Sequence, residues 1–236
     1  MAKFDSDWIP QAAMTIFAHP DDMEFSCGAT LAKWAQAGCE ITVVLCTSGN
    51  VGTHDVKFTP YSLAALREEE QKNACDVLGI KHIEFLRHDD CRLVPDLMLR
   101  RELVQLIRQH KPEVVFCGDP NLVFWGPNRI NHPDHRAAAF AALDAIFPCA
   151  SMELLWPAEG AAHEVHGVYV RAFEQLDTWI DVGDTIELKI KALREHHCQL
   201  DDYKDLEGTI RQRAIDAGKE KGMAFAENFR VVRLKE

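Results

Sequence analysis

Two short runs of histidine and acidic residues carry the chemistry that this sequence could perform. The first, IFAHPDDMEF, brings His19, Asp21, Asp22 and Glu24 within six residues. An imidazole and a carboxylate three positions apart on a turn can bind one metal ion, at about 2.0–2.2 Å for zinc. The alternative is that Asp21 and Asp22 cap a helix that begins near Ser26. Capping requires only one carboxylate, however, and leaves the histidine unexplained.

The second run, NRINHPDHRAAAF, places His132 and His135 three residues apart, on the same side of a predicted helical first turn. Asn131 is a candidate N-cap, and Pro133 suits the first turn of the alanine-rich helix that follows. A pair of solvated histidines at a helix end is the alternative for this run taken alone. Together, the two runs offer three ligands and an open position, which is the pattern of a catalytic zinc site.

The elements around these runs predict a doubly wound, mostly parallel, Rossmann-like α/β sheet with helices on both faces. Apolar, β-branched runs predict strands, and intervening segments of helical period predict helices. The strands are expected at 14–18, 41–46, 82–86 and 114–117, and the helices near 29–36, 62–78 and 96–110. A strand order of 3-2-1-4-5 puts the loops after the first and fourth strands at one crevice. One His/Asp run follows each of these two strands.

The pattern changes after about residue 147. We expect a single domain over residues 1–236, with a core at about 12–147 and a C-terminal extension at about 148–236. The extension is expected to hold short strands at 165–170, 178–182 and 229–234, and a helix at 184–197 with Asp184 as its N-cap. This region is the one expected to shape a substrate pocket or a subunit contact.

Composition excludes several classes of function. The balance of 26 Lys+Arg against 37 Asp+Glu gives a net charge of −11, which disfavours nucleic acid and anionic lipid as partners. No apolar stretch approaches the roughly 20 residues that cross a bilayer. The N-terminus lacks the basic and apolar regions of a secretory signal, so a cytoplasmic protein is expected. The 8 cysteines form no CxxC pair and are expected to be free thiols.

The paired motifs AHPDDME and NHPDHR, in that order, resemble those of the PIG-L/LmbE-like N-deacetylases. Weaker similarity in CGATLAKWAQAG, TSGN, the REEE…LG segment and KIKALREHHCQ extends the resemblance over roughly residues 15–199. The resemblance implies a zinc-dependent hydrolase that removes the N-acetyl group from an N-acetylglucosamine-type amino sugar or conjugate. It also implies a small-molecule amino-sugar substrate and a homo-oligomer, either a trimer or a hexamer.

The resemblance assigns roles to the residues of both runs. It implies that His19, Asp22 and His135 bind the metal, that Asp21 is the general base, and that His132 stabilises the transition state. Zinc is the expected cation, with Fe²⁺ or manganese as alternatives, because geometry and supply decide between them at such a site.

Position in the family pattern also implies two substrate contacts. Arg67 falls where the family places an arginine near the substrate, although an ion pair with Glu70 or a contact with Gln71 on a helix surface is an equal alternative. Asp90 matches an acidic residue near the sugar hydroxyls, and its neighbour Asp89 makes this match ambiguous by one position.

Five further residues have expected places. Asp134 and Glu24 are expected behind the metal ligands, where Asp134 orients a histidine. Trp125 is a candidate to stack on a sugar face at the rim of the pocket, with packing as an equal alternative, whereas Phe124 is expected to pack in the core. His196 matches a histidine of a C-terminal motif, with a solvated helix face as the alternative.

Three departures from the family pattern leave the substrate open: Cys27-Gly28, Asn50 and Cys91. An amidase for larger sugar-thiol conjugates is therefore a rival function, because the same metal centre would serve it. A non-catalytic metal- or sugar-binding protein is a second rival, although pure binding has no need for Asp21. A nucleotide-binding module is disfavoured, since no GxGxxG follows the first strand.

Overall fold

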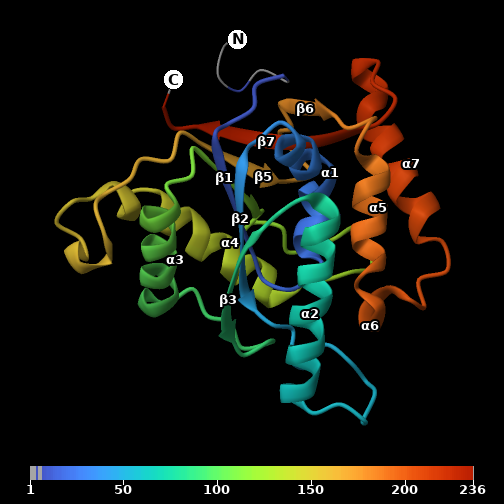
Figure 1. Cartoon of the computed structure of the whole chain (residues 1–236), viewed down its shortest axis with the longest axis horizontal. Coiled ribbons are helices and arrows are strands. Elements are labelled where there is room, and N and C mark those ends of the chain that lie inside the picture. Colours follow the sequence, from blue (N-terminus) through green and yellow to red (C-terminus); the bar gives the residue numbers. More distant parts are fainter. Residues whose placement is uncertain (1–3, 5–6, 236) are drawn as a thin grey trace.

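The computed structural model describes residue 4 and residues 7–235, which form a seven-stranded sheet between two layers of helices (Figure 1). The strands are β1 (Ala12–Phe17), β2 (Glu40–Thr47), β3 (His82–His88), β4 (Val114–Gly118), β5 (Gly167–Arg171), β6 (Thr178–Asp181) and β7 (Ala226–Arg233). The α-helices are α1 (Asp22–Gln36), α2 (Pro60–Leu78), α3 (Leu97–His110), α4 (Pro133–Ile146), α5 (Ile186–Arg194), α6 (His197–Leu200) and α7 (Leu206–Gly218). Single 3₁₀ turns lie at Cys149–Ser151, Pro157–Glu159 and Lys219–Lys221.

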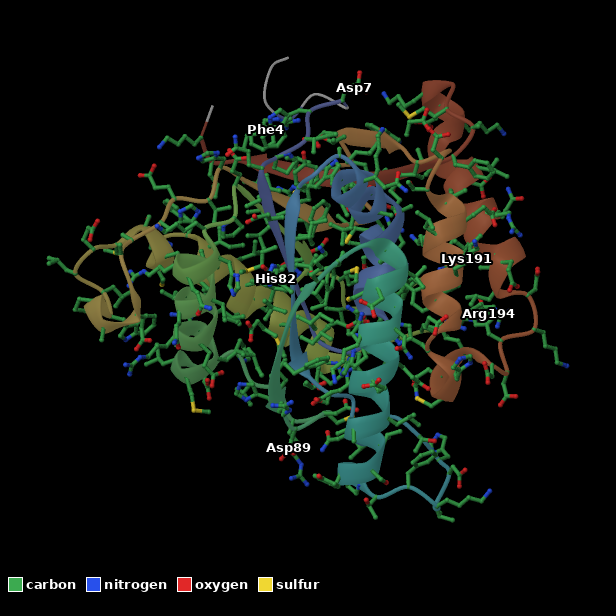
Figure 2. The ribbon with its side chains drawn as sticks, viewed as in Figure 1. Phe4, Asp7, His82, Asp89, Lys191 and Arg194 are labelled. Carbon is green, nitrogen blue, oxygen red and sulfur yellow. The ribbon has the colours of Figure 1, made fainter. Side chains whose placement is uncertain are left out.

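The strand order is β3-β2-β1-β4-β5-β7-β6, which confirms the predicted order 3-2-1-4-5. The first five strands are parallel, and β7 runs antiparallel to both β5 and β6. Figure 2 shows Asp89, which directly follows β3, at one end of the sheet and Phe4 and Asp7 at the other. The strands of the expected extension continue the same sheet, while the division into core and extension stays a prediction.

Side chains of the central strands alternate between two cores. Ala13 and Phe17 of β1 belong to the core under α1, α2, α5 and α7, whereas Met14 and Ile16 belong to the core under α3 and α4. Figure 1 shows these two groups of helices on opposite sides of the sheet. Burial on both faces explains why the strands read as continuous apolar runs rather than as alternating ones.

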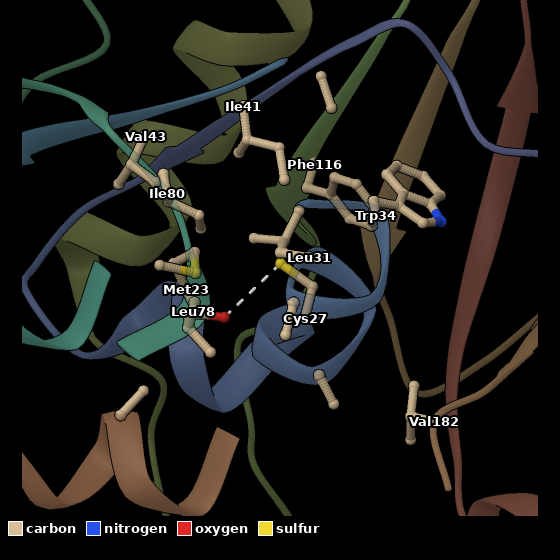
Figure 3. Packing of buried hydrophobic residues seen from close by; sticks show 14 of the residues in the cluster. Met23, Cys27, Leu31, Trp34, Ile41, Val43, Leu78, Ile80, Phe116 and Val182 are labelled. Atoms are coloured by element: carbon tan, nitrogen blue, oxygen red, sulfur yellow. Dashed lines mark hydrogen bonds between the residues drawn. The ribbon is translucent and has the colours of Figure 1, made fainter. Parts of the chain in front are cut away.

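Packing of α1 against the sheet fixes the position of the first His/Asp run. Figure 3 shows Met23, Cys27, Leu31 and Trp34 of this helix buried in one core, with Trp34 against Phe116 at 5.2 Å between ring centroids. Each large side chain buried in this way contributes about 1.5–3 kcal/mol. The helix therefore holds its N-terminus, which carries the acidic residues, firmly at the end of β1.

Two predicted helix caps are wrong. Helix α4 begins at Pro133 with His132 as its N-cap, because the His132 Nδ1 accepts the Asp134 N–H at 3.3 Å, and Asn131 lies one residue earlier. Helix α5 begins at Ile186 after Thr185, not after Asp184. The buried Thr185 hydroxyl donates to the Ala29 carbonyl oxygen of α1 at 2.8 Å, and this contact sets where the chain turns into α5.

The cysteines are free thiols, as predicted, and six of the eight are buried. Cys91 is exposed and Cys198 is partly buried. Within residue 4 and residues 7–235, no helix is both long and apolar enough to span a membrane.

Candidate metal and catalytic site

A cavity of about 440 Å³ lies at the carboxyl ends of β1 and β4, within the range of roughly 300–1,000 Å³ that small-molecule sites occupy. His19, Asp21 and Asp22, from the loop after β1 and the start of α1, line it together with His132 and His135 from the start of α4. Because β1 and β4 are parallel neighbours, their loops end at the same edge of the sheet. The topology thus brings together two motifs that are distant in the sequence.

His19 is buried among carboxylates. Its Nδ1 lies 3.5 Å from Asp22 Oδ2, and its Nε2 lies 3.1 Å from Asp90 Oδ1 and 3.5 Å from Asp134 Oδ2. Burial lowers the pKa of His19, but the hydrogen bonds to these three carboxylates raise it well above its usual value. Three acidic groups around one imidazole make this a place that favours positive charge.

Asp22 connects the two motifs. Its Oδ2 accepts the backbone N–H of His19 at 2.9 Å, and its Oδ1 lies 3.1 Å from His135 Nε2. Burial raises the pKa of Asp22, whereas His135 and His19 lower it well below its usual range. Helix α1 already begins at Asp22, so the alternative of two carboxylates capping a helix near Ser26 is wrong.

The groups of described residues that could hold a metal ion offer nitrogen and oxygen atoms. The ring centroids of His19, His132 and His135 lie 4.7–5.4 Å apart. Among the described residues, two sets have ligand atoms within 4.8 Å of one another: His19, His132 and His135, and His19, Asp90, His132 and Asp134. His19 and His135 thus meet as predicted, with Asp22 in contact with both. Imidazole and carboxylate donors fit zinc or Fe²⁺.

Asp21 adopts an unusual backbone conformation, with a φ of 88°, and its side chain makes no capping hydrogen bond to α1. Left-handed non-glycine residues are uncommon and cluster at functional sites. Burial raises the pKa of Asp21 to about 6, although Arg67 lowers it and Asp22 raises it further. A carboxylate with a pKa near neutrality is suited to proton transfer.

Arg67 is buried and bonded to the loop that carries Asp21. Its Nη2 donates to the Pro20 carbonyl oxygen at 2.8 Å and to Asp21 Oδ2 at 3.3 Å, while Nη1 donates to the Gly49 carbonyl oxygen at 3.2 Å. The alternative of a surface ion pair with Glu70 is wrong. Gly49 has a φ of 61°, and a Cβ there would lie 2.1 Å from Arg67 Nη1. The TSGN loop therefore requires glycine at this position.

His132 has a defined tautomer. Its Nδ1 accepts a backbone N–H, so in the neutral ring the proton lies on Nε2, which faces Cys91 Sγ at 3.4 Å. Burial and the neighbouring His19 lower the pKa of His132. The neutral ring can thus donate a hydrogen bond through Nε2, so His132 does not have to carry a positive charge to act as a donor.

Asn131 orients His135. Its Oδ1 accepts from His135 Nδ1 at 2.9 Å, and its Nδ2 donates to the Leu122 carbonyl oxygen at 2.9 Å, which fixes the amide. The Nδ1–H of His135 is thereby engaged, and Nε2 is left to face the site. The amide of Asn131 therefore accepts a hydrogen bond from His135, and Asn131 is not the N-cap of α4 that was expected.

Asp90 and Asp134 stand behind the histidines. Asp90 is buried and lines the cavity, while Asp89 is exposed, so the structure favours Asp90 over Asp89 for a place in the site. The Asp90 backbone N–H donates to Asn50 Oδ1 at 2.9 Å, so this departure from the family pattern helps to hold Asp90. Asp134 Oδ2 accepts the Cys91 N–H at 2.7 Å. Burial raises the pKa of Asp90, but His19 lowers it well below its usual range.

Glu24 acts on Asp21 rather than on the metal ligands. Its Oε1 accepts from Gln71 Nε2 at 2.5 Å, and the Gln71 Oε1 accepts the Asp21 N–H at 3.2 Å. Its Oε2 lies 3.5 Å from His196 Nε2. His196 is fully buried, so the alternative of a solvated helix face is wrong. Sequence reasoning missed Gln71 as a functional residue, because nothing but its helical position distinguishes it.

The loop before α4 and the C-terminal third contribute further residues to the cavity wall. Trp125 lines it and packs edge-on against Phe173, with ring centroids 5.3 Å apart. Arg171, Gln199, Tyr203 and Arg213 also line it and were missed from the sequence. The expectation that Phe124 packs in the core is wrong, since 69% of it is exposed at the loop surface.

Comparison with known proteins identifies the family of this chain. Residues 14–146, more than half of the chain, match the family model described as PIG-L, GlcNAc-PI de-N-acetylase. The chain belongs to the PIG-L family. It is 31% identical over 224 residues to a diacetylchitobiose deacetylase of Thermococcus kodakarensis, which covers 93% of this chain and 82% of that protein.

Solved structures of similar fold extend beyond deacetylases. The N,N'-diacetylchitobiose deacetylase of Pyrococcus horikoshii, complexed with its inhibitor MPG, superposes with a TM-score of 0.86 and 27% identity over 95% of this PIG-L chain and 84% of its own. GalB, the 4-carboxy-2-hydroxymuconate hydratase of Pseudomonas putida KT2440, superposes with a TM-score of 0.79 over 96% and 98% of the two chains, at 22% identity. The fold alone therefore does not define the reaction.

Proposed function

We propose that this PIG-L protein is a metal-dependent N-deacetylase that removes the acetyl group from an N-acetylglucosamine-type amino sugar or conjugate. One observation carries the proposal: partly buried Asp21 lines a ligand-sized cavity together with His19, Asp22 and His135. A binding site alone has no use for an additional, partly buried carboxylate with a pKa of about 6. The family and the similarity to diacetylchitobiose deacetylases support an amide of an amino sugar as the substrate.

The residues present suit a divalent cation held by His19, Asp22 and His135, with zinc as the first candidate and Fe²⁺ as the second. When bound, the cation supplies a Lewis acid for the amide carbonyl and acidifies a water molecule. Asn131 holds His135 in the orientation that such a ligand requires, which is a usual arrangement behind metal-bound histidines. Asp90 and Asp134 orient His19 in the same way, through its Nε2.

Asp21 takes a proton from the attacking water and then delivers one to the departing amine. Its position is set from both sides, because Arg67 contacts the carboxylate and Gln71 accepts the backbone N–H. Both Nη atoms of Arg67 are bonded to the protein, and its Nε is buried without a partner among the described residues, so we assign Arg67 to positioning Asp21, with the predicted substrate contact as the alternative. Glu24 supports the same residue through Gln71.

His132 donates from Nε2 to the oxyanion that forms as the amide carbonyl is attacked. Removal of one such donor typically costs about 100- to 1,000-fold in kcat. Trp125 is assigned to the apolar face of the sugar. Asp90 keeps the predicted contact with the sugar hydroxyls in addition to its hydrogen bond with His19. The assembly into a trimer or hexamer stays a prediction.

Acetate release from N-acetylglucosamine and from diacetylchitobiose tests the proposal. Zinc-loaded protein should release acetate, whereas chelated protein should not. Asp21→Asn should retain the metal and lose about 100- to 10,000-fold in kcat. Asp89→Asn is the matched control, since this exposed carboxylate neighbours the site without facing it.

Two other outcomes have distinct meanings. Bound metal without acetate from either sugar would favour the rival amidase that acts on larger sugar-thiol conjugates. Metal that does not bind at all would overturn the proposal, since no non-metal hydrolase arrangement is offered by this cluster of residues.

A further inference from the structure

Three arginines line the cavity in addition to the His/Asp cluster and Arg67: Arg129, Arg171 and Arg213. They come from three separate segments, the loop before α4, the end of β5, and α7. Elsewhere on the surface, Arg87 and Arg211 pair with glutamates. A protein with a net charge of −11 has thus gathered three cations from distant parts of its chain at one cavity.

Arg171 is held in place but retains unused donors. Its guanidinium lies 5.3 Å from the centroid of the Phe173 ring, and its Nη1 donates to Asn228 Oδ1 at 3.1 Å. Its Nε and Nη2 have no hydrogen-bond partner within the described part of the chain. Burial lowers the pKa of Arg171 and nearby Arg213 lowers it further, while Glu227 opposes both. Arg171 and Arg213 also line the same cavity.

The carboxylates nearby do not neutralise these charges. Glu227 is bonded to Lys189 Nζ at 2.6 Å and to the backbone N–H groups of Ala29 and Thr30. Besides Asp21, Asp22 and Asp90 at the metal and catalytic site, Asp119 is the one carboxylate among the described residues that lines the cavity. Across residue 4 and residues 7–235, Arg129 and Arg213 have no carboxylate within 4.0 Å. This part of the wall is left with an excess of positive charge.

We propose that Arg129, Arg171 and Arg213 form an anion subsite, which holds a carboxylate or phosphate on the part of the substrate beyond the N-acetylated sugar. The inference rests on the proposed function, because it assigns a substrate class to the same cavity. Guanidinium groups match the planar, two-oxygen geometry of both anions. An anion would otherwise be repelled by the acidic protein, so a local group of cations is what such a ligand requires.

Phe173 lies between Arg171 and Trp125, the residue proposed to stack on the sugar. Phe173 contacts Trp125 on one side and lies beneath Arg171 on the other, and the Trp125 N–H donates to the Arg129 carbonyl oxygen at 2.8 Å. A sugar stacked on Trp125 would thus lie near the guanidinium of Arg171, while Arg129 lines the same cavity from the loop that carries Trp125. A neutral disaccharide leaves these charges unused, so the natural substrate is the conjugate with an acidic aglycone.

Two glycosides that differ only in charge test the subsite: 4-carboxyphenyl and 4-carbamoylphenyl N-acetylglucosaminide. At low salt, the kcat/KM for acetate release should be about tenfold higher for the carboxylate. Arg171→Gln and Arg213→Gln should each reduce this ratio severalfold. Arg211→Gln is the matched control, because it removes the same charge from α7 at a side chain that pairs with Glu187. N-acetylglucosamine 1-phosphate in a third arm distinguishes phosphate from carboxylate recognition.

The outcomes separate the subsite from the reaction. Equal kcat/KM for the two glycosides would overturn the subsite and leave the deacetylase intact. A preference that survives both arginine substitutions would also overturn it, since the carboxylate would then be bound by the metal centre. If neither glycoside releases acetate, the Kd values of the two glycosides, measured by calorimetry, test the subsite. Tighter binding of the carboxylate that depends on Arg171 and Arg213 would support the subsite, and equal Kd values would overturn it.

Discussion

The two parts of the cavity differ in how their polar groups are used. In the His/Asp cluster, His19, Asp22 and His135 are bonded to one another, and the residues behind them fix each orientation. On the other wall, Trp125, Arg129 and Arg213 are exposed and Arg171 is half-buried, and these residues have few polar partners. A preorganised cluster is what a reaction requires, whereas a wall with unused donors is what ligand selection requires.

This difference predicts separate kinetic effects. Substitutions in the cluster should change metal affinity, kcat or the pH profile, while substitutions on the wall should act mainly on KM and on the choice of substrate. The following predictions test this separation, from the largest expected effect to the smallest.

The largest of these effects is expected at Asn131, which touches the cluster without belonging to it. Asn131→Ala removes the acceptor for His135 Nδ1 and should weaken metal binding by about 10- to 100-fold. Competition with a chromophoric chelator measures this affinity. Asn131→Asp keeps an oxygen acceptor and should restore much of it.

Asn128→Ala serves as the control, because this exposed asparagine lies in the same loop. Native metal affinity in Asn131→Ala, with the fold intact by circular dichroism, would show that His135 does not depend on its partner. The separation between cluster and wall would then lose its structural basis.

The sequence predicts the cluster well because its residues are adjacent in the chain. His19, Asp21 and Asp22 share one turn, and His132 and His135 share another, so spacing alone reveals them. The meeting of the two turns follows from the parallel order of β1 and β4, which apolar periodicity also predicts. The local sequence pattern and the parallel topology together are sufficient to predict that these five residues lie close to one another.

The wall could not be predicted in the same way. Arg171 and Arg213 are single residues on β5 and α7, and they reach the same cavity because β7 lies antiparallel beside β5 and α7 packs on β7. No short motif encodes such a contact. The wrong assignments of Asn131 and Phe124 have a related cause, since N-cap preference and hydrophobicity are local tendencies that tertiary contacts override.

The pH dependence provides the second prediction. Asp21 acts as a base only when ionised, and its pKa of about 6 would be higher without the opposing charge of Arg67. Arg67→Gln should therefore move the acid limb of kcat/KM to higher pH, by about one pH unit, so that activity is lost first on the acid side. A profile from pH 4.5 to about 8 measures the limb.

The comparison between variants cancels the effect of the bound cation, which acts on Asp21 in native protein and variant alike. Arg87→Gln is the control, since it removes an exposed guanidinium that pairs with Glu68 outside the site. An acid limb that stays in place in Arg67→Gln would mean that Asp21 does not limit the rate at low pH. Arg67 would then revert to a substrate contact.

The smallest effect is expected on the wall, at Trp125. Trp125→Ala removes one face of the aromatic pair with Phe173 and should raise KM for an N-acetylated sugar by about 3- to 10-fold, with a smaller change in kcat. Phe124→Ala is a closely matched control, because the neighbouring ring is more exposed and does not line this cavity. A fall in kcat at constant KM would place Trp125 with the catalytic cluster, and the functional boundary between the two parts of the cavity would have to be moved.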